Sequence, residues 1–289
     1  MSKSDWQRLV GRRETITSRQ NPRVKHVARL RDRQARDEAG ELVIEGTRSL
    51  RRALDCGYRP HTVYFCPELC KGKDEETLLA DAATAGATLW ATSAPVLRKM
   101  AYRSRPEGVI GVGPQLATRL DELRVSDQPL LVVAVGVGKP GNLGAILRSA
   151  DAVGADGVIV CRSGSGAGTD VHNPNVVWAS TGTIFSVPIA EAGSAETLAW
   201  LREHAIGVLA ATPHGDAEYT AADLRSPVAI VVGSEPAGLS HTWLDAADLR
   251  VRIPMLGRAD SLNVATATTI LLYEALRQRR TADKDVDKP

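Results

Sequence analysis

The stretch Leu130–Asp151, "LLVVAVGVGKPGNLGAILRSAD", decides the fold of the second half of the chain. Its first six residues are all apolar, which is typical of a parallel strand buried on both faces. After Pro140, apolar residues recur at helical spacing, as in Leu143, Ile146 and Leu147. A strand, a glycine-rich loop and a helix in this order predict an α/β unit, and ligands bind such units where the strand ends.

The glycines of this loop follow the dinucleotide-binding pattern Gly136-x-Gly138-x-x-Gly141. That pattern requires an acidic residue about 20 positions later, at the end of the next strand, and here Arg162 follows the last residue of that strand, Cys161. Arg162 would suit the 2'-phosphate of NADP, but Pro140 inside the turn does not fit. A phosphate-binding P-loop is excluded because Lys139 is followed by Pro140 rather than Ser or Thr. An NADP-dependent oxidoreductase stays an alternative.

The helix after this loop carries a single charged side chain on its polar face. At about 100° per residue, Arg148 lies opposite the apolar stripe, among Gly144, Ala145 and Ala152. A solvated face normally carries several polar residues. A lone Arg among small residues therefore indicates a place where a ligand or another backbone approaches, with a surface ion pair as the alternative.

The rest of the second half repeats the alternation of strands and helices. This predicts a mostly parallel sheet with helices on both faces and a last helix from Leu262 to about Arg279. The predicted strands are Leu130–Val135, Gly157–Cys161, Ile184–Val187, Gly207–Ala211, Val228–Gly233 and Leu249–Ile253.

Two later loops carry polar residues at the ends of such strands. "VVGSEPAGLS" (231–240) contains Glu235, and "RIPMLGRADSLNVATATTILLYEAL" (252–276) places Ser261 and Asn263 at the first turn of the last helix. Taken singly, these are a loop carboxylate and two helix-capping residues. Because parallel strands share one carboxyl edge, the three loops are expected to meet there.

The first half predicts a smaller α/β domain. Its predicted helices cover 47–56 and 74–85, besides one that ends at Gly40, and its strands cover 42–44, 61–65, 87–91 and 108–113. The predicted organisation is a flexible basic arm (1–15), this domain (16–113), a polar linker (114–127), the second domain (128–281) and a disordered tail (282–289).

The charge of the chain is concentrated near its beginning. Of the 289 residues, the first 60 hold fifteen Lys or Arg against eight Asp or Glu, although the whole chain carries only +2. This imbalance suggests a polyanionic partner such as nucleic acid, with a solvated basic helix face as the alternative.

The apolar content of 43% is that of a globular protein. With no signal sequence and no apolar run of about 20 residues, we expect a cytoplasmic protein. Its four cysteines are then expected to be reduced thiols. A metal at Cys66 and Cys70 with His61 would lack the second pair of ligands that zinc sites usually show.

Three segments, "KPGNLGAILRSADAVGADGVIV", "VVGSEPAGLS" and "IPMLGRADSLNVATATTILLYEALR", resemble in this order the three signature motifs of the SpoU/TrmH family. These are RNA ribose 2'-O-methyltransferases of the SPOUT class, and the resemblance covers 128–280. The segment "ITSRQNPRVKHVARLRDRQARDEAGELVIEGTRSLRRAL" is similar to the family's ribosomal-protein-like substrate-binding domain. The architecture resembles members that methylate large-subunit (23S) ribosomal RNA, including some that confer antibiotic resistance.

The resemblance implies a deep trefoil knot, a homodimer formed through the SPOUT domain, and S-adenosylmethionine as cofactor. No metal site is expected. The implied cofactor-binding residues are Thr212, Gly233, Ile253 and Leu262. Arg148 matches the arginine that activates the ribose hydroxyl, with Asn142, Glu235, Ser261 and Asn263 around it. The expected RNA contacts are Arg19, Asn21, Lys25, Arg29, Arg31, Arg33 and Arg36. A tRNA ribose methyltransferase and an inactive RNA-binding protein are alternatives.

Two departures from the family pattern bear on these expectations. The stretch 170–189, often basic in the family, carries Asn175 and Trp178 here, which weakens the prediction that it contacts RNA phosphates. Pro236 stands in the second motif where Gly is common, a change that a turn tolerates.

Overall fold

The computed structural model describes residues 14–70, 72–162 and 168–286, which form two compact units. The first unit contains residues up to Leu116 together with Asp170–Ser186, and the second contains Ala117–Thr169 and the residues from Val187 onward. Nearly all of the predicted basic arm lies outside the described residues. Among the described residues, no helix has the length and apolarity needed to cross a membrane.

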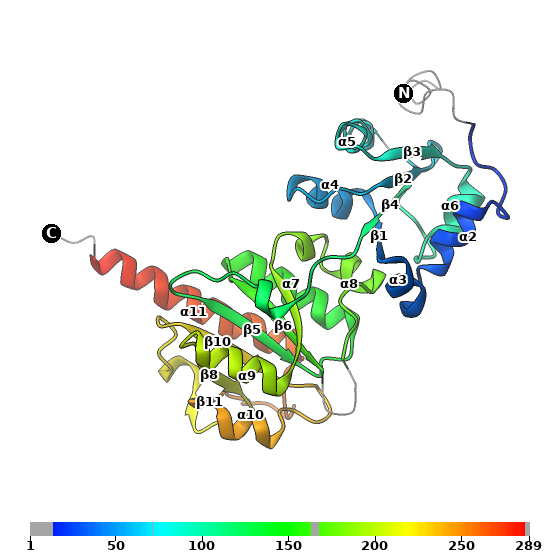
Figure 1. Ribbon diagram of the computed structural model, residues 1–289. Coiled ribbons are helices and arrows are strands. Elements are labelled where there is room, and N and C mark those ends of the chain that lie inside the picture. The colour runs from blue at the N-terminus through cyan, green and yellow to red at the C-terminus, as the bar shows by residue number, and fades with distance from the viewer. Residues whose placement is uncertain (1–13, 71, 163–167, 287–289) are drawn as a thin grey trace. The chain divides into compact units, whose positions relative to one another are not determined.

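The first unit is built on a four-stranded mixed sheet (Figure 1). The central strand β4 runs antiparallel to both of its neighbours, β1 and β2, and β3 is parallel to β2. The strands, in spatial order, are β1 (Glu41–Glu45), β4 (Val109–Pro114), β2 (Thr62–Phe65) and β3 (Thr88–Ala91).

Helices of the first unit pack in pairs. The helices α2 (Pro22–Arg29) and α6 (Ala94–Met100) contact one another, and Val24 and Val27 of α2 point into an apolar cluster because they are three residues apart. The helices α4 (Thr47–Asp55) and α5 (Lys73–Thr84) form the second pair. The short helix α3 (Arg33–Ala39) ends at Gly40, whose φ of +64° is the left-handed conformation that glycine adopts readily.

Residues 170–186 belong to the first unit although they lie between two strands of the second unit in the sequence. Helix α8 (Pro174–Ala179) packs against the edge strand β1. Arg36 forms an ion pair with Asp170, and the Arg52 guanidinium donates a hydrogen bond of 2.9 Å to the carbonyl of Thr181. The predicted domain boundaries place this segment in the second domain, because apolar periodicity does not reveal which of two cores a short helix joins.

The second unit contains a seven-stranded, all-parallel sheet in the order β7-β6-β5-β10-β8-β11-β9 (Figure 1). This agrees with the predicted mostly parallel sheet. The strands are β5 (Leu130–Val135), β6 (Gly157–Arg162), β7 (Ile189–Gly193), β8 (Gly207–Ala211), β9 (Ala217–Glu218), β10 (Val228–Val232) and β11 (Leu249–Arg252).

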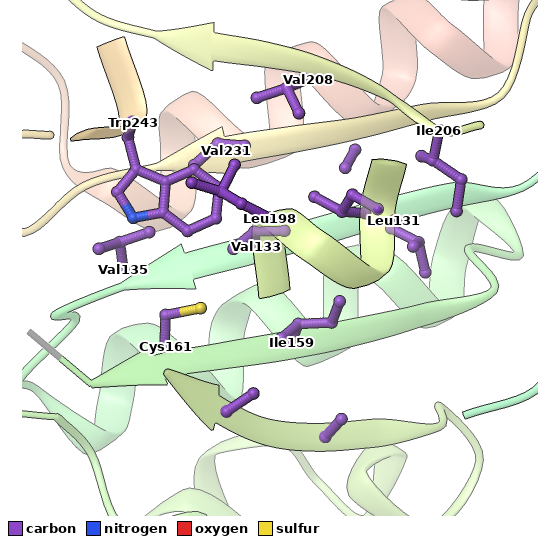
Figure 2. Packing of buried hydrophobic residues seen from close by; sticks show 14 of the residues in the cluster. Leu131, Val133, Val135, Ile159, Cys161, Leu198, Ile206, Val208, Val231 and Trp243 are labelled. Atoms are coloured by element: carbon purple, nitrogen blue, oxygen red, sulfur yellow. The ribbon is translucent and has the colours of Figure 1, made fainter. Parts of the chain in front are cut away.

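Helices cover both faces of this sheet. On one face lie α9 (Ser194–Glu203) and α10 (His241–Ala246), and on the other lie α7 (Pro140–Val153) and α11 (Val264–Val286), which contact one another. Figure 2 shows Leu131, Val133 and Val135 of β5 in the cluster that also contains Leu198 of α9 and the fully buried Trp243 of α10. The intervening residues of β5 are buried on the opposite face, as successive side chains of a strand alternate.

Two sequence predictions for this unit are corrected. Residues 184–187 are not a strand: Thr181 and Gly182, both at positive φ, begin a tight turn that continues as a 3₁₀ helix over Thr183–Phe185. The strand begins after Pro188, which has no amide hydrogen to donate. The last helix continues to Val286, beyond its predicted end, so most of the predicted tail is helical.

The predicted linker is partly a segment of the second unit, since Leu120 and Leu123 are buried in its core. The chain makes close backbone approaches in this unit. A Cβ at Gly215 would lie 2.3 Å from the carbonyl carbon of Val251, so only glycine fits there. The trefoil knot stays a prediction.

Candidate functional site

The carboxyl edge of the large sheet brings the polar loops of the second unit together. Val232, the last residue of β10, is in register with Ala134 of β5 and Ala211 of β8, and Ala211 is in register with Val251 of β11. The loops that follow these four neighbouring strands therefore begin at the same level. The predicted meeting of three strand-ending loops at one edge is confirmed.

At this edge Asn142, Glu235 and Asn263 form a closed hydrogen-bond triangle. The Asn142 amide donates to Glu235 Oε1 at 3.1 Å, and Asn263 donates to Glu235 Oε1 at 2.8 Å and to Asn142 Oδ1 at 3.1 Å. Each residue comes from a different loop or helix start, following β5, β10 and β11 respectively. The triangle thus fixes the three loops to one another.

Asn263 has two tasks in this arrangement. Its side-chain oxygen accepts hydrogen bonds from the backbone N–H groups of Ala265 and Thr266, at 3.0 and 3.4 Å, and so caps the first turn of α11. Its amide nitrogen is then directed at Glu235 and Asn142. The capping hydrogen bonds hold the amide oxygen of Asn263 toward the helix. The start of α11 therefore determines that Asn263 presents its N–H groups, and not its oxygen, to Glu235 and Asn142.

Lys139, immediately before α7, forms an ion pair with Glu235. Together with the hydrogen bonds from Asn142 and Asn263, this contact lowers the pKa of the Glu235 carboxyl, and the Lys139 hydrogen bond is the largest cause. In the sequence, Lys139 followed by Pro140 excludes a P-loop and carries no further prediction. Its position at the start of a helix at the carboxyl edge was the signal that marks it as a site residue.

Replacing Lys139 by Met is expected to raise the pKa of Glu235 toward its ordinary value. A carboxylate with a lowered pKa keeps its hydrogen bonds above that pKa and loses them as the pH falls through it. The triangle should therefore dissolve at a higher pH in the variant than in the unaltered protein. A carbon-13 NMR titration of the glutamate carboxyls measures this shift; Lys73→Met, at an exposed lysine of the first unit, is the control. An unchanged Glu235 titration would contradict the assigned contact.

Arg148 and Ser261 lie outside the triangle. Arg148 follows Asn142 by six residues on α7, which places it about 9 Å farther along the helix axis, and its side chain is exposed. Neighbouring Ser149 forms a 2.6 Å hydrogen bond with Thr269 of α11. No hydrogen bond or ion pair joins Arg148 or Ser261 to another residue within the described ranges. The Arg148 guanidinium is therefore available to an external group.

The four predicted cofactor-binding residues lie at or beyond this same edge. Gly233 and Thr212 directly follow β10 and β8, Ile253 follows β11, and Leu262 precedes Asn263. Ile253 and Leu262 are half-buried, and a Cβ at Gly233 would lie 2.2 Å from the carbonyl carbon of Gly238. Aliphatic side chains beside strand-end backbone groups suit a flat heteroaromatic ring with polar edges. These residues fit the adenosyl part of S-adenosylmethionine, and their roles stay a prediction.

The predicted RNA-contact residues of the first unit differ in their surroundings. Arg19, Lys25 and Arg29 are exposed. Asn21 caps α2, accepting a hydrogen bond from the Arg23 backbone at 2.9 Å, and exposed Arg33 pairs with Asp37 at 3.4 Å.

The two remaining arginines are engaged within the unit. Arg31 donates to the carbonyls of Lys99 and Ala101. Arg36 is 1% exposed and donates to the carbonyls of Leu30 and Arg31 as well as to Asp170. The prediction that Arg36 contacts RNA is therefore wrong, because its guanidinium does not reach the surface. Arg36 instead forms an ion pair and hydrogen bonds inside the first unit.

The cysteines give no sign of a metal site. Cys66 is buried and Cys70 is half-buried, and burial raises the pKa of Cys70 to about 12. In the described part of the chain, no group of His, Cys, Asp or Glu side chains is arranged to hold a metal ion.

Comparisons with known proteins match both units. The model of the SpoU rRNA Methylase family matches residues 129–273, and that of the MRM3-like substrate binding domain matches residues 21–111. The 23S rRNA (uridine(2479)-2'-O)-methyltransferase of Streptomyces viridochromogenes is 35% identical over 286 residues, covering 96% of this chain and 97% of the relative.

Two solved structures resemble the chain over most of its length. A crystal structure of an RNA 2'-O ribose methyltransferase is 43% identical with a TM-score of 0.80, covering 92% of this chain and all of the other. The SpoU methyltransferase AviRb of Streptomyces viridochromogenes, in complex with the cofactor AdoMet, is 33% identical with a TM-score of 0.82, covering 91% and 99%. The chain that joins Asn142, Glu235 and Asn263 at the edge of its parallel sheet belongs to the SpoU rRNA methylase family.

Proposed function

We propose that this protein transfers a methyl group from S-adenosylmethionine to a ribose 2'-hydroxyl of 23S ribosomal RNA. The observation that carries the proposal is the triangle of Asn142, Glu235 and Asn263, which joins the three motif loops at one edge. A relative that methylates a uridine ribose of 23S rRNA shares almost the full length of the chain. This substrate implies a cytoplasmic enzyme.

S-adenosylmethionine would supply a methyl group bonded to a positively charged sulfur. The ribose 2'-oxygen would bond to the methyl carbon in line as the carbon–sulfur bond breaks, S-adenosylhomocysteine would leave, and the hydroxyl proton would pass to water. The contribution of the chain is to place this oxygen and to favour the loss of its proton. We assign Arg148 to bind the neighbouring phosphate and to stabilise the charge that develops on the 2'-oxygen. A guanidinium keeps its proton above pH 12, so it acts as a donor and charge partner rather than as a simple base.

The triangle holds the surroundings of the reacting ribose. Glu235 is ionised at neutral pH, because Lys139 and two amides favour its charged form. Both N–H groups of the Asn263 amide are used within the triangle, so Asn263 holds the other two side chains in place. The second N–H of Asn142 and the Glu235 carboxylate remain to hydrogen-bond the ribose. Ser261 lies two residues before Asn263 and supplies a hydroxyl at the same helix start. Fixed polar groups of this kind avoid reorganisation during the reaction.

The first unit supplies the sequence-independent part of RNA affinity in this proposal. Arg19, Lys25 and Arg29 are exposed cations on or next to α2. Neutralising phosphates with such side chains releases counterions, and binding of this kind weakens as salt rises.

We further propose that the protein acts as a homodimer formed through the second unit. Leu256, in the loop before α11, is 99% exposed, and Tyr273 on α11 is 50% exposed. A partner subunit that covered these two side chains would remove their apolar surface from water.

The deciding experiment measures cofactor binding first and methylation second. Isothermal titration calorimetry should show binding of S-adenosylmethionine and none of NADP; the reverse result would replace the proposal with the oxidoreductase alternative. Ribose-methylation mapping of ribosomal RNA, from cells with and without the gene, should then reveal one 23S position that depends on the protein. A methylated tRNA position, with ribosomal RNA unchanged, would move the proposal to tRNA.

A further inference from the structure

Two large aromatic side chains of the first unit are exposed on one surface. Tyr102 is 40% exposed and Trp178 is 39% exposed, whereas most of the unit's other apolar side chains are buried. Tyr102 belongs to the loop 101–107, "AYRSRPE", and Trp178 to α8. Exposed aromatics next to basic residues are typical of surfaces that bind a partner.

Contacts join these two segments into one surface, which we call the aromatic platform: Tyr102, Arg103, Asn175 and Trp178. The Arg103 guanidinium carbon lies 3.6 Å from the centre of the Trp178 ring. The Asn175 side-chain amide donates a 3.1 Å hydrogen bond to the Tyr102 hydroxyl. Asn175 and Trp178 are three residues apart on α8 and therefore lie on the same face of that helix.

A buried carboxylate holds the loop beneath this platform. Glu45, at the end of β1, is 4% exposed, and its Oε2 accepts hydrogen bonds from the backbone N–H groups of Tyr102 and Arg103, at 2.8 and 3.3 Å. Burial raises the pKa of Glu45, against the effect of these two hydrogen bonds. Its other oxygen is buried without a hydrogen-bond partner among the described residues. Burying a carboxylate oxygen without a hydrogen-bond partner costs free energy, and here the other oxygen of the same carboxylate holds the loop in place.

A fixed aromatic surface that includes a guanidinium is suited to stacking with RNA bases. Unpaired bases of RNA stack on aromatic rings and on arginine planes, and a preformed surface lowers the entropic cost of holding them. Arg105, exposed in the same loop, adds positive charge for the phosphates beside such a base. The Asn175 side-chain oxygen offers an acceptor at the rim for a base edge.

We propose that Tyr102, Arg103, Asn175 and Trp178 form a stacking platform for an unpaired nucleobase of the substrate RNA. The proposal rests on the proposed function for the identity of that RNA, but stacking itself is tested separately.

The probes are a twelve-nucleotide single-stranded oligouridylate and an abasic ribose-phosphate oligomer of the same length. The full-length protein should bind the first more tightly, with quenching of tryptophan fluorescence. Trp178→Ala should weaken oligouridylate binding about 5- to 150-fold, the range for loss of one base–aromatic stack, and abolish most of the quenching. Trp178→Phe keeps an aromatic ring and should restore most of the affinity. Equal binding of the two probes, or unchanged affinity in Trp178→Ala, would overturn the platform.

Two further measurements separate this proposal from the proposed function. S-adenosylmethionine binding, measured by calorimetry, should be the same in Trp178→Ala as in the unaltered protein. Methylation of ribosomal RNA by that variant should show a raised KM with a smaller change in kcat. If the unaltered protein binds no S-adenosylmethionine but still prefers the base-containing probe, the proposed function fails and the platform stands. If it methylates RNA and Trp178→Ala has an unchanged KM, the platform fails.

Discussion

Replacing Arg148 by Ala is expected to lower the rate of methyl transfer by about 10²- to 10³-fold, the usual effect of removing one donor that stabilises a developing negative charge. The physical reason is the position of this guanidinium. It is exposed on α7 and is bound to no other residue in the described part of the chain, so its charge is available to RNA. Single-turnover methylation with excess enzyme measures this step apart from product release.

The same variant should fold and bind cofactor normally. Exposed residues that make no internal contact change stability by about 0.5 kcal/mol or less when replaced. Calorimetry with S-adenosylmethionine and the thermal unfolding midpoint provide these controls. Arg148→Lys keeps the charge but loses the planar fork, so it should recover only part of the rate. Full turnover by Arg148→Ala would remove Arg148 from the mechanism.

Replacing Arg36 by Ala is expected to destabilise the first unit by about 3–5 kcal/mol, the usual effect of removing one partner of a buried ion pair. Asp170 would be left with an unpaired carboxylate, and the carbonyls of Leu30 and Arg31 would lose their donor. Denaturant unfolding, monitored by hydrogen exchange of β1 and α3, measures the loss in the unit that contains them.

Arg33→Ala is the matched control, because Arg33 lies on the same helix with its exposed partner Asp37. Exposed pairs of this kind contribute at most about 1 kcal/mol. Arg36→Met combined with Asp170→Leu should recover much of the stability, since apolar residues of similar size replace buried ion pairs well. Weaker RNA binding by Arg36→Ala at unchanged stability would return Arg36 to the RNA-contact set.

The large sheet and its ligand edge were predictable because the strands are continuous apolar runs. In β5 and β10 the boundaries came within one residue of the structure, since Gly136 and Gly233 interrupt each run as the strand ends. The meeting of Asn142, Glu235 and Asn263 followed from a rule about parallel sheets rather than from any pairwise signal. The hydrogen bonds between them, and the place of Lys139 among them, depend on side-chain directions in the packed structure, which no local sequence pattern reveals.

The incorrect predictions share a physical cause. The charge or apolarity of a residue does not reveal whether a segment distant in the sequence covers its side chain. Arg36 lies three positions after the exposed Arg33 in the same polar stretch. Its burial depends on contacts with the Leu30 and Arg31 carbonyls and with Asp170, which is 134 positions away. Residues 184–187 are apolar enough for a strand, but the turn at Thr181 and Gly182 decides their conformation. Trp178 is exposed although its neighbours Val176 and Val177 are buried. Helix α8 packs against β1, and Trp178 lies on the side of the helix that remains in solvent.

The return of residues 170–186 to the first unit limits how this protein can be dissected or recombined. The chain passes from the first unit to the second after Leu116, returns after Thr169 and enters the second unit again at Val187. Three covalent connections therefore link the two units. A fragment that ends at the linker would lack α8 and expose the edge strand β1 to unwanted pairing. A chimera that exchanges RNA specificity between relatives must therefore transplant two segments of sequence, the N-terminal part and 170–186, as a single graft.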